Sequence, residues 1–525
     1  MIKHKNSNKP NGLIGFEQFE ANWVKIQEQK ELEAKAKIAK LDEEFPQQER
    51  TMRLAQSKAA EESAKRAAEL EKYDPGVEID TSKFKPLSAE EIIEILGSTI
   101  KKDESNKLIT FLAQVSCYTE NSQLNISFNA PSSSGKSFIP TEIASLFPQE
   151  DVIEVGYCSP TAFFHDVGKF EEDKQGYTVD LSRKILIFLD QPHTLLLQHL
   201  RPMLSHDKKE IRLKITDKSQ KAGLKTKNIF LIGFPAVIFC TAGLELDEQE
   251  ATRFLLLSPE VNQEKIREAI FEKIKKESDS VKYKFAVESD PQRQLLKERL
   301  RAIKQEGITD IKIESPSLVE QLFFERVKVL KPRHQRDVAR ILSIVKIFAL
   351  INMWFRERRD TTIIATDEDI KEAFKVWDTV SESQELNLPP YVLNIYKDVI
   401  IPDFLSHNQG IENVGVGVIG LTRRNISDKH YQTYGRILPD WQLRQQILPL
   451  LETAGLITQE PDEKDKRKIL IYPTTQLTIS KPQNNSESEG RVKTKTIDQL
   501  SEDEQLELAK SIFGEGTKWA EEPII

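Results

Sequence analysis

Short apolar runs alternate with helix-like segments between residues 124 and 260. The runs cover residues 124–129, 152–155, 185–189 and 236–240. Runs of this length are typical of buried strands, and strands that alternate with helices favour a largely parallel sheet flanked by helices. We therefore predict an α/β fold with a parallel sheet at its centre.

Helical patterns occupy most of the remaining chain. Residues 16–73 are rich in Glu, Lys, Ala and Gln, and Pro46 interrupts their apolar spacing of threes and fours. This segment is either a solvated helical arm or a long two-stranded coiled coil. Ser88 and Glu91 have the spacing of a capping box, so we expect a folded unit to begin near them. Residues 264–382 also have a helical pattern.

These patterns divide the chain into five parts. They are a charged helical arm and linker (1–80), an α/β core with preceding helices (81–262), a helical lid region (263–384), helices followed by a pair of strands (385–475), and a polar linker with a short amphipathic tail helix (476–525). A chain of 525 residues exceeds what one hydrophobic core usually organises, which agrees with several domains.

The composition predicts a soluble, cytoplasmic protein. Apolar residues make up 38% of the chain and charged residues 30%, with a formal net charge of -8. This acidic balance means that any nucleic-acid surface must be a local basic patch. Cys117, Cys158 and Cys240 lie in apolar runs, which fits buried reduced thiols. No stretch approaches the roughly 20 apolar residues of a membrane span, so we expect no membrane partner.

One motif is typical of a nucleotide-binding loop. Between a strand-like and a helix-like run lie Ala130, Pro131, Ser132, Ser133, Ser134, Gly135, Lys136 and Ser137. Small residues let successive backbone N–H groups turn toward phosphate oxygens, and the following helix adds its positive end. Lys136 is placed to reach the terminal phosphates and the Ser137 hydroxyl to coordinate magnesium, so the expected cofactors are ATP and Mg²⁺. The motif usually opens with Gly, and Ala130 fits only with a negative φ.

A carboxylate follows the strand at residues 185–189. Asp190 would lie at the sheet edge where magnesium and nucleotide bind. Many such ATPases place Glu next, but here Gln191 follows. Gln cannot accept a proton, although it can orient water, so hydrolysis is slow, uses another carboxylate, or is absent. His193 either assists or is structural.

With the phosphate loop and Asp190 placed in this order, residues 124–382 resemble the core of the AAA+ ATPases, and more narrowly the minichromosome-maintenance-like helicases. The resemblance covers about half of the chain and rests on short motifs. It implies a ring of subunits, with ATP bound between neighbours.

A predicted hairpin, residues 211–216 and 226–232, looks like the one that such helicases push into their central pore. Lysines surround its tip, namely Lys218, Lys221, Lys225 and Lys227, and further basic residues lie on its base, namely Lys208, Lys209, Arg212 and Lys214. Lysine makes sequence-independent contacts to a nucleic-acid backbone. The alternative is a solvated surface hairpin.

Three further positions match the family's catalytic pattern. Thr241 stands where the family's first sensor residue is more usually Asn. Arg253 looks like the arginine finger, which would enter the neighbouring subunit's site and stabilise charge during phosphoryl transfer; otherwise it is an ion-pair partner. Arg333 resembles the second sensor, with Arg336 one turn away or a plain salt bridge as alternatives.

Residues 386–474 have the rhythm of a winged-helix domain. A helix from Asp440 looks like its recognition helix, although Pro449 should kink or split it. The residues placed to touch DNA are Gln442, Arg444 and Gln445 on this helix and Lys466 and Arg467 near the wing, supplemented by Arg423, Arg424, Lys429, His430 and Arg436. Winged helices also dock proteins, so DNA contact is not the only interpretation.

The leading expectation is an oligomeric, ATP-dependent DNA motor, a helicase or translocase acting in DNA replication. Single-stranded DNA would pass through the pore of a homo-oligomeric ring, and the winged helix would hold duplex DNA. One alternative is an ATP-gated initiator or regulator that binds DNA without unwinding it. Another is a scaffold that assembles partners through its helical arm.

Overall fold

The four apolar runs predicted as strands lie in one parallel sheet. A fifth strand completes it, in the order β2-β5-β8-β1-β9, and every pairing is parallel. The strands are β1 (Ile126–Asn129), β2 (Val152–Val155), β5 (Ile185–Phe188), β8 (Ala236–Thr241) and β9 (Leu255–Leu257). The computed structural model describes residues 78–156, 169–174, 176–191, 194–217, 225–243, 252–408, 419–462 and 465–474. The predicted α/β class is confirmed, since this sheet alternates with helices along the chain.

Helices precede the sheet and connect its strands. They are α3 (Ala89–Gly97), α4 (Glu104–Val115), α5 (Phe138–Ala144) and α7 (Thr194–Leu204), with short 3-10 turns at Thr81–Lys83, Ser116–Tyr118, Gln149–Asp151 and Met353–Phe355. The capping box is confirmed at the start of α3: Glu91 N–H donates to Ser88 Oγ (3.2 Å), and Ser88 N–H donates to Glu91 Oε2 (2.8 Å). It satisfies amide groups that the helix itself cannot pair.

Helices dominate the region after the sheet, as predicted. They are α9 (Gln263–Ser278), α10 (Ser280–Glu288), α11 (Pro291–Glu306), α12 (Pro316–Arg326), α13 (His334–Ile351), α14 (Asp367–Asp378) and α15 (Ser381–Glu385). A small sheet that the sequence did not predict joins them, in the order β10 (Asp310–Ile313), β12 (Thr362–Ala365) and β11 (Arg358–Arg359).

Alternate residues of the central strands pack into two separate cores. Ile185 and Ile187 of β5 belong to the larger core, which includes residues of α4, α5 and α13. Leu186 and Phe188 face the other way and pack in a core that includes α7. This two-residue alternation is the period of a strand covered on both faces, and it makes β5 apolar throughout.

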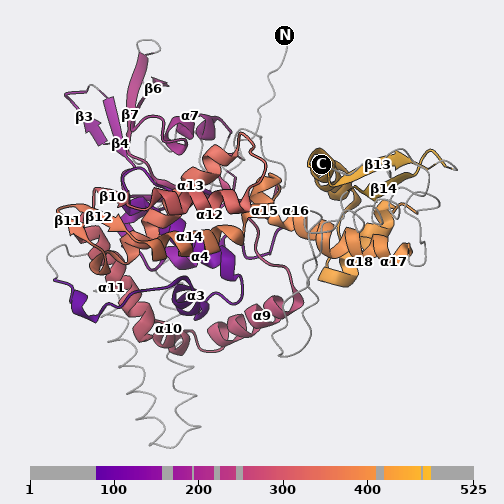
Figure 1. Ribbon diagram of the computed structural model, residues 1–525, viewed down its shortest axis with the longest axis horizontal. Coiled ribbons are helices and arrows are strands. Elements are labelled where there is room, and N and C mark those ends of the chain that lie inside the picture. Colours follow the sequence, from indigo (N-terminus) through magenta and orange to yellow (C-terminus); the bar gives the residue numbers. More distant parts are fainter. Residues whose placement is uncertain are drawn as a thin grey trace, which may run out of the picture. The chain divides into compact units, whose positions relative to one another are not determined.

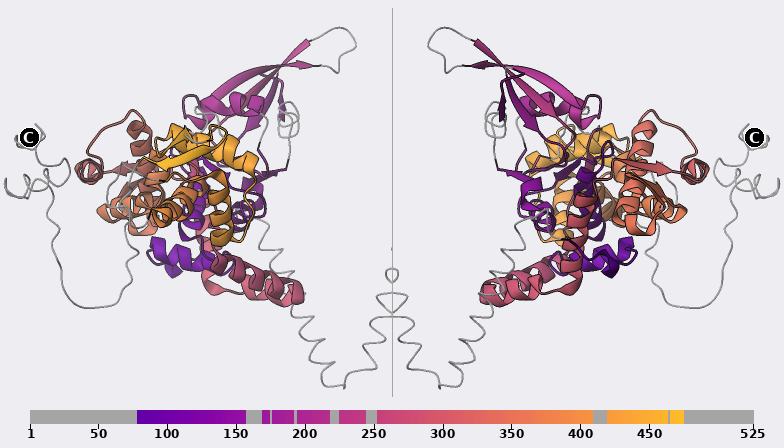
Figure 2. Two further views of the ribbon diagram at one scale, coloured as in Figure 1. Left: turned by 90° about the vertical axis from the view of Figure 1, so that its right-hand side faces the viewer. Right: turned by 90° about the vertical axis from the view of Figure 1, so that its left-hand side faces the viewer.

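A second sheet contains the predicted hairpin. Its order is β3 (Lys169–Glu171), β4 (Gly176–Asp180), β7 (Lys225–Ile232) and β6 (Glu210–Asp217), which lie side by side next to α7 (Figure 1). The hairpin is confirmed, with β6 and β7 antiparallel from Glu210↔Ile232 to Asp217↔Lys225. Figure 2 shows this long pair, coloured magenta, extending away from the helices. Strands β3 and β4 were not predicted.

The last described segment combines helices with one antiparallel pair of strands. Its elements are α16 (Pro390–Ile395), a π-helical turn η5 (Tyr396–Ile400), α17 (Ile401–His407), α18 (Arg423–Tyr434), α19 (Asp440–Gln442), a π-helical turn η6 (Leu443–Ile447), α20 (Leu448–Thr453), β13 (Ile457–Pro461) and β14 (Ile469–Pro473). The expected interruption near Pro449 is confirmed, because η6 ends at Ile447, two residues before this proline. Proline lacks an N–H and clashes with the preceding turn, and a wider π-turn relieves that crowding.

Several predicted features lie outside the described residues. They are the helical arm up to residue 77, the tail from residue 475, His193, Cys158, Lys218 and Lys221.

Candidate functional site

The predicted phosphate loop connects β1 to α5, as its strand–loop–helix context required. Ser133 (φ 64°) and Gly135 (φ 89°) have left-handed backbone conformations, so the chain turns sharply twice within the loop. Ala130 is fully buried and is not among the residues with positive φ, which meets the condition set by its side chain. Its N–H donates to the carbonyl of Thr241 (3.3 Å), and this bond ties the loop to β8.

The loop leaves space and an unsatisfied polar group. A Cβ added to Gly135 would meet no atom within 4 Å. The Ser134 hydroxyl oxygen is buried, and no described residue gives it a hydrogen bond. A buried hydroxyl without a partner loses free energy unless a ligand or water supplies one. These two features indicate a place for a polar ligand against the loop.

Asp190 and Gln191 follow β5, next to β8 in the sheet. Thr241, the last residue of β8, donates from its hydroxyl to Gln191 Oε1 (3.0 Å). Asp190 is exposed, and its Oδ1 accepts the backbone N–H of Gln191 (2.8 Å). Because neighbouring parallel strands end at the same edge, these side chains meet beside the loop that follows β1.

Cys240 connects β8 to the phosphate loop. Its thiol donates to the backbone carbonyl of Lys136 (3.2 Å). Burial raises the pKa of Cys240 to about 12; the charge of Lys136 opposes this shift and that of Asp190 adds to it. The thiol is therefore protonated and able to donate.

Hydrogen bonds between buried polar residues hold the end of β1, directly before the phosphate loop. The sequence did not predict them. Ser258 donates from its hydroxyl to the carbonyl of Asn129 (2.6 Å), the residue before the loop. The side chain of Asn129 donates to the Gly243 carbonyl (3.2 Å) and accepts from Ser127 Oγ (2.6 Å). All three of Asn129, Ser127 and Ser258 are buried. Polar residues within the strand-like run 125–129 were the available signal.

Arg253 lies just before β9 and is half-buried, with its Nε donating to Ser205 Oγ (2.8 Å). Arg340 of α13 donates to the backbone carbonyls of the two residues on either side of Arg253, namely Thr252 (2.9 Å) and Phe254 (3.0 Å). Burial lowers the pKa of Arg340 to about 10, and Asp337 opposes this, so the side chain is charged at neutral pH. Arg340 therefore holds the backbone on both sides of Arg253.

Arg333 immediately precedes α13. Its Nε contacts Asp337 Oδ2 at 3.1 Å, one helical turn on, so the salt bridge that the sequence left open as an alternative is present. Arg336 is exposed.

Basic residues at the base of the β6–β7 hairpin are exposed: Lys208, Lys209, Arg212 and Lys214. Two of them have partners, since Lys209 bonds Glu120 (2.6 Å) and Arg212 bonds Asn228 Oδ1 (3.0 Å). The backbones of Lys225 and Lys227 pair with Asp217 and Ile215 in the hairpin.

The residues proposed for DNA contact in the last segment differ in how far they are exposed. Arg444, Gln445, Lys466 and Arg467 are exposed. Gln442 and His430 are buried, so their predicted place on a DNA-contacting surface is wrong. His430 bonds Tyr391 and the Arg436 carbonyl instead, because its face of α18 packs inward.

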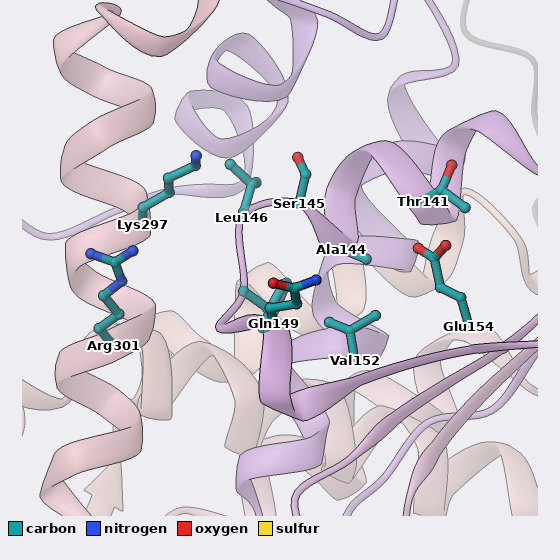
Figure 3. Close-up of a pocket in the computed structure, with 10 residues that line it drawn as sticks. Thr141, Ala144, Ser145, Leu146, Gln149, Val152, Glu154, Lys297 and Arg301 are labelled. Carbon is teal, nitrogen blue, oxygen red and sulfur yellow. The ribbon is translucent and has the colours of Figure 1, made fainter. Parts of the chain in front are cut away.

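A cavity of about 440 Å³ lies between the C-terminal half of α5, β2 and α11. Figure 3 shows Lys297 and Arg301 on one helix, with Glu154 on the opposite side of the opening. None of the predicted site residues lines it. In the described part of the chain, no cluster of His, Cys, Asp and Glu is suited to hold a metal ion by itself.

No family model matches the sequence, and no curated protein is similar to it. Among solved structures, the chain is similar to an active helicase, Cch of SCCmec type IV, with 13% identity over 72% of this chain and 70% of that chain. The TM-score is 0.28, which does not establish a shared fold, so we infer nothing about this chain from it. None of the described helices is both long and apolar enough to cross a membrane.

Proposed function

We propose that this protein is a P-loop ATPase of the AAA+ type that acts as an oligomeric DNA motor. The observation that carries the proposal is the convergence of the loop 130–137 with Asp190, Gln191 and Thr241 at one edge of a parallel sheet. Phosphate loops and catalytic residues occur at this edge in α/β nucleotide-binding proteins.

The residues of the loop fit a triphosphate. Ser134 has a buried hydroxyl in need of a partner, and the space beside Gly135 is open. Lys136 would neutralise the terminal phosphates, while the backbone N–H groups and the start of α5 would hold the others. Ser137 and Asp190, both exposed, would hold Mg²⁺ together with water and phosphate oxygens. ATP with Mg²⁺ supplies the phosphoryl group and neutralises its charge.

Gln191 would orient the attacking water in place of a general base. Its oxygen accepts the Thr241 hydroxyl, which leaves the two N–H donors of the amide to hold the water. Because an amide does not remove the proton, turnover is expected to be slow. Arg253 would stabilise the transferring phosphoryl group in the neighbouring subunit, while Arg333 would contact the nucleotide.

DNA would bind at two places. The hairpin lysines Lys218, Lys221, Lys225 and Lys227 would track the phosphates of a single strand, and Arg444, Lys466 and Arg467 would hold duplex DNA. Lysine contacts of this kind are independent of sequence and weaken with salt. Residues 386–474 would form the winged helix, for which the antiparallel pair β13–β14 supplies a wing. DNA replication is the process in which such a motor would act.

An ATP-gated DNA-binding initiator or regulator is the second candidate. It is favoured by one observation, the presence of an amide rather than a carboxylate at Gln191, fixed by Thr241 beside the loop. A site of that kind holds ATP without hydrolysing it rapidly.

The purified full-length chain tests both functions in one series of assays. We expect slow ATP hydrolysis that DNA stimulates, and displacement of a DNA strand. Stimulated hydrolysis without strand displacement would exclude the helicase and leave a translocase. DNA binding that requires ATP, without hydrolysis, would favour the regulator.

A further inference from the structure

Arg436 extends from the last described segment to the phosphate loop. It lies two residues after α18, and its Nη1 donates to the backbone carbonyl of Ser132 (3.0 Å). Ser132 is the third residue of the loop and is exposed. An arginine separated by about 300 residues in sequence therefore lies at the place where phosphates would bind.

Two other contacts hold this segment against the residues around the loop. The N–H of Tyr391 donates to Ser258 Oγ (3.0 Å), the same hydroxyl that bonds the Asn129 carbonyl. Gln263, at the start of α9, donates to the carbonyl of Tyr434 (2.9 Å). The contact of Arg436 is thus one of several hydrogen bonds that join the last described segment to earlier parts of the chain.

The backbone of Arg436 is itself fixed. Gly435 ends α18 in the left-handed conformation (φ 68°), which turns the chain toward the loop. A ring nitrogen of the buried His430 bonds the Arg436 carbonyl (2.9 Å), and its other ring nitrogen bonds the Tyr391 hydroxyl (3.1 Å). These bonds orient Arg436 before any ligand arrives.

The charge of Arg436 has no neutralising partner among the described carboxylates. Within the described part of the chain, the hydrogen bond of its guanidinium goes to a neutral carbonyl, and the residue is only half-buried. A guanidinium has five donors, and it bonds phosphate oxygens more strongly than a peptide carbonyl. Arg436 is therefore placed to bind an anion in the loop.

We infer that Arg436 binds a phosphate of the nucleotide held by the loop in the same subunit, exchanging the Ser132 carbonyl for phosphate oxygens. This inference rests on the proposed ATP-binding function and adds to it a phosphate ligand from outside the α/β core. Nucleotide binding would thereby draw α18 and its neighbours toward the loop.

The test compares nucleotide affinity in the full-length chain and its variants. Arg436→Ala removes the charge and the donors. Arg436→Gln keeps an N–H for the Ser132 carbonyl but removes the charge. The matched control is Arg359→Ala, because the Arg359 side chain is 65% exposed and is paired with Glu357. Binding of a non-hydrolysable ATP analogue is measured at low and high salt, and thermal unfolding checks that each variant folds.

Loss of one charge-assisted contact should weaken the affinity by about tenfold in both Arg436 variants and leave the control unchanged. The dependence on salt should also decrease, because one ionic contact to phosphate is lost, and a purely structural role would not change it. Wild-type affinity in Arg436→Gln would overturn the inference, since Arg436 would then only support the loop. If the wild-type chain itself bound no nucleotide, the proposed function would fail together with the inference.

Discussion

The hydroxyl of Thr241 donates a hydrogen bond to the side-chain oxygen of Gln191 over 3.0 Å. This bond joins the ends of two adjacent strands, β8 and β5, beside the phosphate loop. The oxygen of the Gln191 amide is therefore held by Thr241, whose hydroxyl also accepts the Gly243 N–H (2.9 Å). The amide nitrogen is thereby left to face the ligand.

Gln191→Glu should increase ATP turnover, because a carboxylate can take the proton from the attacking water. General-base catalysis contributes roughly 10²–10⁴-fold, so we expect an increase of about a hundredfold in kcat. Nucleotide affinity should change little. Steady-state hydrolysis measures this, with Gln335→Glu on the exposed face of α13 as the control. An unchanged or lower rate would show that Gln191 does not stand in the position of a base.

Arg253→Ala should lose hydrolysis and keep nucleotide binding. Arginine fingers contribute on the order of 10³-fold or more to the rate of phosphoryl transfer. Hydrolysis and analogue binding are measured on the same sample, with the exposed Arg359→Ala as the control. Full activity of a monomer, established by mass measurement, would contradict the assignment of Arg253 to a neighbouring subunit's site.

The central part of the fold could be predicted because its signals are local. The strands β1, β2, β5 and β8 are continuous apolar runs, and the capping box at Ser88 and Glu91 is readable from two residues. The phosphate loop could be predicted from its composition and from its place between a strand and a helix.

The remaining features depend on contacts between distant residues. Strand β3 has three residues, too few to show a period, and β4 pairs with β7 across about 50 residues. The role of Arg340 depends on its bonds to the Thr252 and Phe254 carbonyls, which lie more than 80 residues away in sequence. The position of His430 among basic residues favours a surface role, whereas its hydrogen-bond partners lie inside the fold.

Replacing Lys218, Lys221 and Lys225 by Ala should uncouple ATP use from DNA. Basal hydrolysis should remain, because the hairpin tip is remote in sequence from the loop, and its stimulation by DNA should disappear. The matched control replaces three exposed lysines of α9, Lys273, Lys275 and Lys276. Stimulation that survives in the tip variant would exclude the hairpin as the DNA-tracking element.

Stability should depend on pH through His430. Burial lowers the pKa of His430, and the charge of Arg436 also lowers it, while the hydrogen bond to the Arg436 backbone opposes them. The unfolded chain therefore binds a proton on His430 more readily than the folded chain does. The contribution of neutral His430 to the free energy of unfolding is complete above about pH 6.5, and it is lost as the pH falls through the pKa of the folded state.

His430→Gln tests this directly, because Gln donates and accepts but does not titrate. The difference in Tm between wild type and variant should be largest at neutral pH and should decrease on acidification. A difference that stays constant between neutral and mildly acidic pH would show that His430 does not titrate in that range.

Binding of ATP to the wild-type chain and to Lys136→Ala tests the central claim most directly. We expect the wild type to bind ATP in the presence of Mg²⁺, the exposed control Lys83→Ala to bind it equally well, and Lys136→Ala to lose binding or weaken it by at least about tenfold. Equal ATP binding by Lys136→Ala and the wild type would contradict the assignment of residues 130–137 as the phosphate-binding loop.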